Sequence, residues 1–373
     1  MRCVFVSDLR LSHFRSHCRA VLPLDGRPVV LFGANGAGKT NVLEAVSLLS
    51  PGRGLRRATA DELVRQPEGL GWKIEAKLDG VLSHEVETWA EPGQGRRLLI
   101  DGKSAPQIAL AQLLRVIWLV PRQDRLWIEG ADGRRQFFDR MALGFFPEHA
   151  DAVLTYEKAM RERNRLLKNQ IRDTHWYSAV EAQMAGAAAR ITRTRIETLL
   201  QIHAAQEEAE TAFPAAKLTL AEAEGGPEGA EADAKAYAEA FAAARPRDFA
   251  TGRTLFGPHR SDITAIYAAK GVVARQCSTG EQKALLISLI LSNARALKAE
   301  TGTAPLVLLD EIAAHLDADR RAALFDEVCA LDTQAWMTGT GPELFIALGT
   351  RAQYIAVEDR KGKSMLQLLG YRS

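Results

Sequence analysis

The residues at positions 33–40 combine three glycines, a lysine and a threonine in the pattern G-x-x-x-x-G-K-T. The glycines permit backbone angles that other side chains forbid, so this loop can turn its N–H groups inward onto an anion. Lys39 would then reach the β- and γ-phosphates of a nucleotide, and the Thr40 hydroxyl would bind magnesium. The pattern therefore predicts a phosphate-binding loop for ATP and Mg²⁺. Its expected nucleotide-binding residues are Gly33, Asn35, Gly36, Gly38, Lys39, Thr40 and Asn41.

Two adjacent carboxylates, Asp310 and Glu311, follow an apolar run at positions 306–309. Asp310, at the end of the expected strand, would hold magnesium together with Thr40. Glu311 would point the other way and orient or deprotonate an attacking water. Such a pair after a buried strand can also be only the cap of a following helix. Because ATPases with a phosphate-binding loop generally need a second, acidic strand, we interpret the pair as catalytic.

A third motif, with Ser278, Gly280 and Glu281, opens a long apolar stretch. Serine followed three residues later by glutamate is a capping box, and residues 284–297 read as a buried helix. A helix start that carries serine and glycine is also an anion site, because its N–H groups are free and its dipole is favourable. The position of this motif shortly before the acidic strand favours binding of a γ-phosphate. The same residues can serve as both cap and phosphate contact.

The elements around these motifs predict an α/β protein. An apolar strand at positions 29–32 precedes the loop, and residues 41–49 have the spacing of a helix. Asp101 and Gly102 predict the turn of a hairpin over residues 98–103. From about residue 132 to residue 249 the sequence lacks strand-like patterns and predicts helices, apart from a loop or hinge at 221–232. We therefore expect an N-terminal head segment (1–125), a helical arm (126–249) and a C-terminal head segment (250–373).

Composition is consistent with these expectations. The chain has 373 residues, a net charge of +2 and four cysteines without metal-ligand spacing, which suits a reducing, cytoplasmic location. Asp8 and Arg10 interrupt the first apolar run, so we expect no signal peptide. No apolar run reaches the ~18 residues of a membrane span, so no membrane partner is expected. A nucleic-acid surface would have to be local, since the overall charge is small.

Together the motifs resemble the RecF family of bacterial recombination mediators, which are relatives of SMC-type ATPase heads. The resemblance rests on Phe14-Arg15-Ser16-His17, residues 33–40, 52–57, 121–139, 257–262 and 278–283, and the strand ending in Asp310-Glu311. It implies an ABC/SMC-type P-loop ATPase head with an inserted helical arm domain, lobe II. It also implies that Ser278, Gly280 and Glu281 meet the γ-phosphate held by a second copy of the chain.

The resemblance assigns roles to four further residues. Arg15 matches an arginine that touches nucleotide phosphates, with a surface arginine as the alternative. Gln123 matches a loop glutamine near magnesium and the attacking water, which makes it a candidate catalytic residue beside Glu311. Asp317 matches the aspartate of a loop that crosses the dimer interface. Thr338 or Thr340 lies at the switch position, where transporter ATPases usually carry histidine, and this difference implies slow hydrolysis.

Three groups of arginines are candidates for binding DNA. They are Arg53, Arg56 and Arg57; Arg161 and Arg165 on a helix expected at about residues 155–173; and Arg190, Arg193 and Arg195. The alternative for a helical arginine row is a solvated face paired with nearby glutamates. No base-reading motif is present, so contacts would go mainly to phosphate and would not depend on sequence.

The expected function is ATP-dependent DNA binding in repair. By resemblance, an ATP-driven homodimer would clamp duplex DNA near gaps or single-strand/double-strand junctions and promote RecA loading with RecO and RecR as partners. The expected enzyme activity is a weak, DNA-stimulated ATPase. One alternative is a DNA scaffold that binds ATP without significant hydrolysis. A transporter-type ABC subunit is disfavoured, because Cys277-Ser278-Thr279-Gly280-Glu281 replaces the Leu-Ser-Gly-Gly-Gln expected there.

Overall fold

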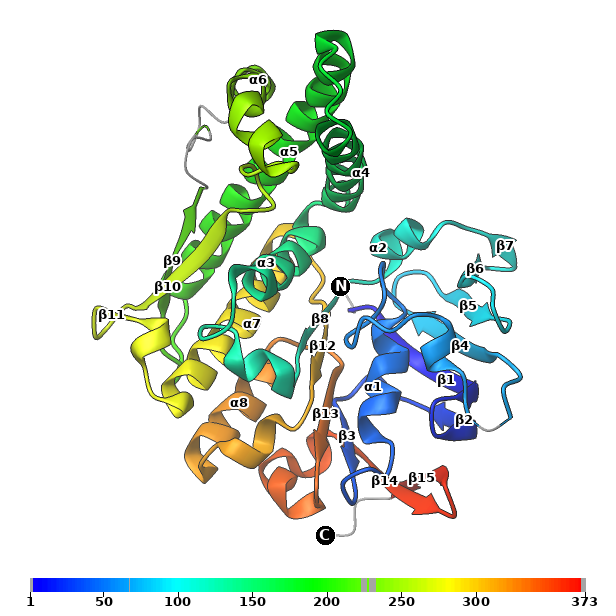
Figure 1. The fold of residues 1–373 in the computed structure, drawn as a ribbon. Helices are drawn as coiled ribbons and strands as arrows, with labels where there is room; N and C mark the ends of the chain where they lie inside the picture. The colour runs from blue at the N-terminus through cyan, green and yellow to red at the C-terminus, as the bar shows by residue number, and fades with distance from the viewer. Residues whose placement is uncertain (1–2, 67, 223–226, 228–232, 370–373) are drawn as a thin grey trace. The chain divides into compact units, whose positions relative to one another are not determined.

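The computed structural model describes residues 3–66, 68–222, 227 and 233–369, without the side chains of residues 314 and 315. Residue contacts divide the chain into two compact units (Figure 1). The first comprises Met1–Asp124, Ala209–Phe213 and Leu286–Ser373, and the second comprises Arg125–Glu208 and Pro214–Leu285. The loop expected at 221–232 lies almost entirely outside the described residues. The functional division at residues 125/126 and 249/250 stays a prediction.

The first unit contains two six-stranded sheets and the helices that pack on them. Its strands are β1 (Phe5–Phe14), β2 (His17–Pro23), β3 (Val29–Phe32), β4 (Trp72–Asp79), β5 (His84–Ala90), β6 (Arg97–Ile100), β7 (Lys103–Ser104), β8 (Val116–Leu119), β12 (Leu306–Leu309), β13 (Ala335–Gly339), β14 (Gln353–Arg360) and β15 (Lys363–Leu369). Its helices are α1 (Lys39–Ser47), α2 (Leu110–Leu113), the last part of α7 (Thr279–Thr301), α8 (Ala318–Ala330) and the 3-10 helices η1 (Asp61–Leu63), η2 (Gln107–Ala109), η3 (Pro121–Arg125, at the unit boundary), η6 (Ile312–His315) and η7 (Pro342–Arg351).

One sheet has the strand order β15-β14-β3-β13-β12-β8 and is parallel except for β15. All four residues of β12 are buried, as are the first three of β3, which is typical of strands covered on both faces. Parallel neighbours share a direction, so their carboxyl ends meet at one edge. The segments that follow β3, β13 and β12 therefore lie side by side, although β3 precedes the other two by more than 250 residues along the chain.

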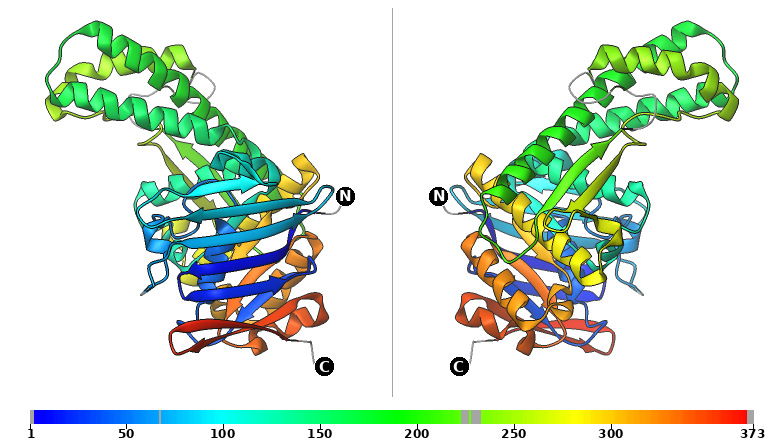
Figure 2. Two further views of the ribbon diagram at one scale, coloured as in Figure 1. Left: turned by 90° about the vertical axis from the view of Figure 1, so that its right-hand side faces the viewer. Right: turned by 90° about the vertical axis from the view of Figure 1, so that its left-hand side faces the viewer.

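The other sheet, with the order β2-β1-β4-β5-β6-β7, is antiparallel throughout. One core joins both sheets to α1, with Leu9 and Ile74 from the antiparallel sheet, Leu31 and Leu308 from the parallel sheet, and Leu43 from the helix. In Figure 2 the antiparallel sheet faces the viewer on the left, and α8 covers the opposite side of the unit on the right. The helix that begins in the phosphate-binding loop is thus enclosed in the core, which makes the loop's position rigid.

The second unit is mainly helical. It contains α3 (Ala131–Phe145), α4 (His149–Lys168), α5 (Thr174–Glu207), α6 (Ala234–Thr251), the first part of α7, the 3-10 helix η5 (Ala274–Gln276), and the sheet β11-β10-β9 formed by β9 (Ala216–Ala221), β10 (Asp262–Tyr267) and β11 (Val272–Val273). Helices α4, α5 and α6 share an apolar core that includes Tyr156, Met184 and Phe241.

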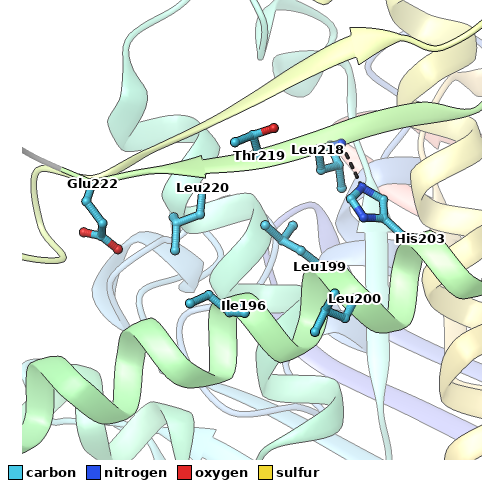
Figure 3. A pocket seen from close by; sticks show the side chains of 8 residues that line it. All are labelled: Ile196, Leu199, Leu200, His203, Leu218, Thr219, Leu220 and Glu222. Carbon is cyan, nitrogen blue, oxygen red and sulfur yellow. Dashed lines mark hydrogen bonds between the residues drawn. The ribbon is translucent and has the colours of Figure 1, made fainter. Parts of the chain in front are cut away.

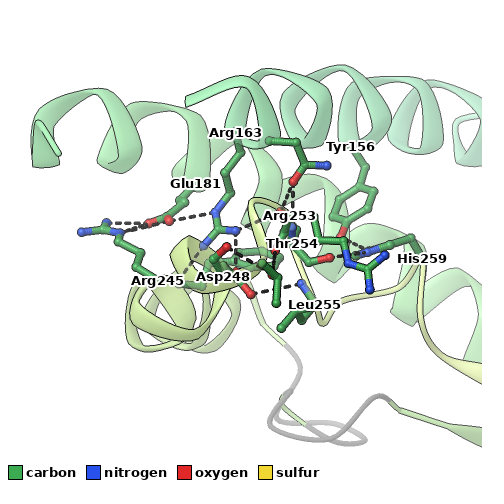
Figure 4. A network of polar contacts seen from close by, with 12 residues as sticks. Tyr156, Arg163, Glu181, Arg245, Asp248, Arg253, Thr254, Leu255 and His259 are labelled. Carbon is green, nitrogen blue, oxygen red and sulfur yellow. Dashed lines mark hydrogen bonds and ion pairs between the residues drawn. The ribbon is translucent and has the colours of Figure 1, made fainter. Parts of the chain in front are cut away.

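A buried ion network crosses that core (Figure 4). The Arg163 guanidinium has no exposed surface and donates to Glu181 at 2.9 Å and to Asp248 at 2.6 Å. Arg245 also pairs with Glu181, and Thr254 accepts a further hydrogen bond from Arg163. Two positive and two negative charges thus balance inside the unit. Because an unpaired buried charge is costly, the network ties α4, α5 and α6 together.

Several expectations about elements are confirmed and three are wrong. The strand and helix around the phosphate loop, the Asp101-Gly102 hairpin and the buried helix over 284–297 are present. The helix expected at about 155–173 ends at Lys168, because Gln170 adopts a left-handed conformation that breaks it. The strand β9 lies in a segment expected to be helical. Arg195 is buried against Asp139, so its place in a DNA-binding cluster is wrong.

Candidate nucleotide site

The phosphate loop has a backbone that only glycine can supply at two positions. Gly33 has φ 150° and Gly38 has φ 105°. A Cβ atom at Gly33 would collide with the Val357 carbonyl, and one at Gly38 would collide with the Ser364 and Ser16 hydroxyls. Ser364 Oγ also donates to the Ala37 carbonyl at 2.6 Å. The loop is therefore held from outside by β14 and β15, two strands far away in sequence.

Lys39 is buried within this loop. Its ammonium donates to the carbonyls of Gly33 at 2.7 Å and Ala34 at 2.9 Å. Burial lowers the pKa of Lys39, while the carboxylates of Glu311 and Asp310 oppose that shift. The ammonium thus lies among backbone amides, and it is close enough to Asp310 and Glu311 to interact electrostatically with both carboxylates. This is the environment that binding of a phosphate requires.

Thr40 and Asp310 are brought together at the carboxyl edge of the parallel sheet. The Thr40 hydroxyl donates to the two Asp310 carboxylate oxygens at 3.0 and 3.1 Å. Burial raises the pKa of Asp310, and the hydroxyls of Thr338 and Thr40 oppose part of that rise. A hydroxyl and one carboxylate fit Mg²⁺, which takes few protein ligands and completes its octahedron with phosphate oxygens and water. The described residues contain no cluster of three or more acidic, histidine or cysteine side chains that would favour another metal.

Glu311 follows in a left-handed conformation, with φ 54°. Its N–H donates to Thr338 Oγ1 at 2.8 Å, and the same threonine hydroxyl donates to Asp310 at 2.7 Å. A left-handed non-glycine residue costs of order 1–3 kcal/mol and is retained where the surrounding structure requires it. Thr338 is fully buried, so its side chain serves these two carboxylate-bearing residues. A direct contact of Thr338 with phosphate stays a prediction.

The turn between β1 and β2 packs on the phosphate loop and carries contacts that spacing did not reveal. The Ser16 hydroxyl accepts from Asn41 Nδ2 at 2.7 Å. His17 is buried, and its Nε2 lies 3.1 Å from the Gly38 carbonyl. Burial lowers the pKa of His17, so a neutral ring donates this hydrogen bond. Arg15 on the same turn forms an ion pair with Glu44 of α1 at 2.8 Å.

Gln123 lies in η3, directly after β8, the strand beside β12. The Asp310 N–H donates to the Leu119 carbonyl, so the segment that carries Gln123 starts next to the acidic pair. The Gln123 side chain accepts from the Val120 N–H at 2.9 Å. Its catalytic role stays a prediction.

Ser278, Gly280 and Glu281 belong to the second unit. The expected capping box is confirmed, because Glu281 accepts from the Ser278 N–H at 2.8 Å and from the Ser278 hydroxyl at 2.9 Å. Hydrogen bonds from Lys270 and Ser278 lower the pKa of Glu281 to about 2. Ser278 and Gly280 are exposed at the start of α7, and a Cβ atom on Gly280 would meet no other group. The N-terminus of this helix is accessible to an anion from outside the chain.

Asp317 caps α8 through a hydrogen bond from the Arg320 N–H at 2.8 Å. Its side chain is well exposed, so the cap leaves it accessible. An interface role stays a prediction.

The candidate DNA-binding arginines differ in their surroundings. Arg53 and Arg57 are exposed, and neither forms an ion pair with another described residue. Arg161 pairs with Glu157 and Arg165 with Glu162, both at 3.6 Å on the solvated face of α4. Arg56 instead donates to Asn41 at 2.8 Å and to Glu44 at 3.0 Å. It therefore belongs to the surroundings of the nucleotide site.

A pocket of about 290 Å³ lies elsewhere, between α5 and β9 in the second unit (Figure 3). Its lining is mostly leucine and isoleucine. His203 Nε2 accepts from the Leu218 N–H at 2.9 Å, and burial lowers the pKa of this histidine. The pocket is therefore largely apolar, with one carboxylate, Glu222, in its lining and no lysine or arginine among the described residues there to bind a triphosphate.

The sequence matches the family model described as the RecF/RecN/SMC N terminal domain over residues 5–345. The chain belongs to this family. It is 47% identical to the DNA replication and repair protein RecF of Rhizobium meliloti (strain 1021) over 365 residues, which cover 95% of this chain and 97% of the relative. The RecF protein of Allorhizobium ampelinum is 44% identical over the same share of both chains. This RecF-family chain is thus similar to its relatives along almost its whole length.

Solved structures agree on the fold. The recombination mediator protein RecF-ATPrS in the RecFOR pathway superposes with a TM-score of 0.83 at 20% identity, covering 99% of both chains. The Smc head domain with an extended coiled coil from Pyrococcus furiosus superposes with a TM-score of 0.57 at 16% identity, covering 98% of this chain and 96% of that one. The predicted fold class, a P-loop ATPase head of the ABC/SMC type with an inserted helical arm, is confirmed. Within the described residues, no helix has the length and hydropathy needed to cross a bilayer.

Proposed function

We propose that this RecF-family chain is an ATP-binding recombination mediator that acts on DNA in replication and repair. The observation that carries the proposal is the convergence of Lys39, Thr40, Asp310 and Glu311 at one edge of the parallel sheet. The names of its relatives support the biological setting. The bound nucleotide would be ATP with Mg²⁺, held by the loop at 33–40 and by Asp310.

Hydrolysis would use Glu311 as the base. In this reaction a water oxygen attacks the γ-phosphorus while Glu311 accepts a proton from that water. The bond between the γ-phosphorus and the bridging oxygen breaks, which releases ADP and inorganic phosphate. Magnesium, when bound by Thr40 and Asp310, would neutralise charge on the phosphates. Thr338 holds both carboxylate-bearing residues in place, and Gln123 would help to orient the water. The expected turnover is slow.

The triphosphate would also join two copies of the chain. The exposed helix start at Ser278 and Gly280 offers N–H groups and a positive dipole end to the γ-phosphate of a second copy. Asp317 would lie in the same interface. Closing such a dimer around duplex DNA would double the phosphate contacts and make ATP a switch for DNA affinity. Partners would be RecO and RecR, with RecA loading near single-strand/double-strand junctions as the outcome, in a cytoplasmic setting.

Dimerisation provides the first test. With ATP and Mg²⁺ we expect the full chain to elute as a dimer in size-exclusion chromatography with light scattering. Lys39→Met should abolish both ATP binding and the dimer, because the loop loses its only ammonium. Ser278→Arg should keep ATP binding in the monomer and block the dimer, because it obstructs the helix start.

The control for this test is Ser178→Arg, which places the same side chain at an exposed position of α5. It should dimerise like the unaltered protein. Loss of ATP binding in the Ser278→Arg monomer would contradict a role for Ser278 in the partner's site. A dimer that forms equally well with Lys39→Met would contradict the proposed nucleotide switch.

A scaffold that binds ATP without significant hydrolysis remains a second candidate, because Thr338 replaces the histidine of transporter ATPases. Phosphate release with and without duplex DNA separates the two. If the protein is a DNA-stimulated ATPase, the Glu311→Gln variant should no longer release phosphate, and its ATP-bound dimer should be longer-lived. Equal, negligible release from the unaltered protein and from Glu311→Gln would favour the scaffold.

A further inference from the structure

Glu44 is a fully buried carboxylate that the proposed chemistry does not use. It lies on α1, five residues after Lys39, and its side chain has no exposed surface. Both carboxylate oxygens face guanidinium groups. Oε1 accepts from Arg15 Nη2 at 2.8 Å, and Oε2 accepts from Arg15 Nε at 2.9 Å and from Arg56 Nη1 at 3.0 Å. One carboxylate therefore holds two arginines from two different loops.

The two arginines lie over the first turns of α1. Arg56 Nη1 bridges Glu44 and the Asn41 side chain, one helical turn apart, and Asn41 directly follows Thr40. Arg15 belongs to the turn whose Ser16 hydroxyl accepts from Asn41 and lies against Gly38. Arg56 thus lies over the first turn of α1, where the helix dipole and the loop amides already favour an anion. Arg15 lies beside it on Glu44 and also donates to the Glu62 carbonyl at 2.6 Å.

The charges explain why a carboxylate stands at this position. Two guanidiniums in contact would repel each other, and one buried carboxylate between them removes that repulsion. It also fixes the planar Arg15 group through two parallel hydrogen bonds, a geometry that a neutral side chain reproduces poorly. The two guanidiniums carry one more positive charge than Glu44 balances, and Arg56 lies close enough to the site to interact with the charge of Asp310. Arg56 keeps 41% of its side chain exposed, so it remains accessible to a ligand.

We propose that Glu44 is a positioning residue of the nucleotide site, which orients Arg15 and Arg56 so that their positive charge reaches the phosphates of ATP. The proposal rests on the proposed function, since it concerns the same site. Glu44 itself touches no ligand. It acts through the two arginines, and its removal should weaken binding only as far as those arginines contribute.

The test measures the dissociation constant of ATP with Mg²⁺ for the full chain. Glu44→Gln keeps the size of the side chain and removes its charge. We expect affinity to fall about tenfold, the effect of losing one well-placed charged contact. The salt dependence of the remaining affinity should be weaker. Glu91→Gln is the matched control, because the Glu91 carboxylate is exposed and accepts from Gln94 Nε2 at 2.9 Å, away from both arginines. It should bind ATP like the unaltered protein.

A double-mutant cycle separates positioning from a general loss of structure. In a background with Arg15→Gln and Arg56→Gln, adding Glu44→Gln should cause little further loss of ATP affinity, because the groups it orients are gone. A structural role would instead give additive losses in both backgrounds. Additive losses, or unchanged affinity in Glu44→Gln alone, would overturn the proposal. Lys39→Met provides the separate check on the site, because unchanged ATP binding in that variant would overturn the proposed function itself.

Discussion

A single buried hydroxyl connects the two acidic residues of the candidate site. Thr338 Oγ1 donates to the Asp310 carboxylate and accepts from the Glu311 N–H. The first contact favours the charged form of Asp310 against the effect of burial, which raises its pKa. The second stabilises the left-handed backbone of Glu311. One side chain thus positions both the proposed magnesium ligand and the proposed base.

Replacement of Thr338 by valine tests this connection. Thr338→Val keeps the shape and removes the hydroxyl, so the pKa of Asp310 should rise further and the Glu311 N–H should lose its acceptor. Metal binding needs the ionised carboxylate, and protonation increases as the pH falls. Mg²⁺-dependent ATP binding should therefore be lost at a higher pH than in the unaltered protein. The unfolding free energy should fall by about 1–3 kcal/mol.

The control is Thr338→Ser, which retains the hydroxyl and should keep the original pH profile. Titrations of ATP affinity across acidic pH would give both profiles. If valine and serine behaved alike, the hydroxyl would not control Asp310.

At the scale of elements, the second unit contains a histidine that should respond to pH. His259 lies in the loop between α6 and β10, and its Nδ1 accepts from the Tyr156 hydroxyl of α4 at 2.7 Å. Its Nε2 lies 3.3 Å from the Thr254 carbonyl. Burial lowers the pKa of His259 to about 4, and the nearby charges of Arg260, Arg135 and Arg195 act in the same direction. The ring is therefore neutral where it joins the loop to α4.

This contact predicts a loss of stability on acidification. The unfolded chain binds the proton near pH 6.5 while the folded chain does so only near pH 4, so the unfolded state binds more protons between these values. The unfolding free energy should fall by about 2–3 kcal/mol from pH 7 to pH 4 because of this group. Urea unfolding at several pH values, followed by hydrogen exchange of α4 amides, measures it. His259→Gln should flatten the profile, and an equally steep profile in that variant would assign the effect to other groups.

Local patterns predicted the elements that depend on neighbours in sequence. The glycines around Lys39, the Ser278–Glu281 capping box and the Asp101-Gly102 turn each contain their own physical cause, and the structure has all three. The helix predicted to continue past Lys168 was wrong. The helical spacing of apolar residues continues in the sequence, but the helix ends near Gln170, which adopts a left-handed conformation although no glycine marks the position.

Contacts between distant parts of the chain could not be predicted. The alternation of apolar and polar residues in β9 covers only six residues and lies within an alanine-rich sequence that favours helix. The antiparallel pairing of this segment with β10 makes it a strand. Ser364 holds the phosphate loop from more than 300 residues away. Arg56 looked like part of a DNA-binding cluster, and only the structure brings it to Glu44 and Asn41.

At the scale of the whole molecule, DNA binding should depend on the exposed arginines that have no ion-pair partner among the described residues. Arg53 and Arg57 are such residues. If each contacts one phosphate, Arg53→Ala with Arg57→Ala should lower the log–log salt slope of duplex binding by about 1.8, at ~0.9 per contact. Fluorescence anisotropy with ATP over a range of salt concentrations measures the slope.

Arg27→Ala is the comparison, because Arg27 is already paired with Asp25 at 2.6 Å. It should leave the slope unchanged. Equal slopes for the unaltered protein, the double variant and Arg27→Ala would place the DNA contacts elsewhere. Arg161 and Arg165 would then be the next candidates to replace.

The strand that carries the phosphate loop has both of its sheet neighbours near the end of the chain. β3 lies between β13 and β14, so during synthesis it must wait for roughly 300 further residues, or about 15–60 s at usual ribosome speeds. For that time a short, fully apolar strand has neither edge paired in its sheet. We therefore expect a chain that stops before β13 to lose nucleotide binding although its phosphate loop is translated intact.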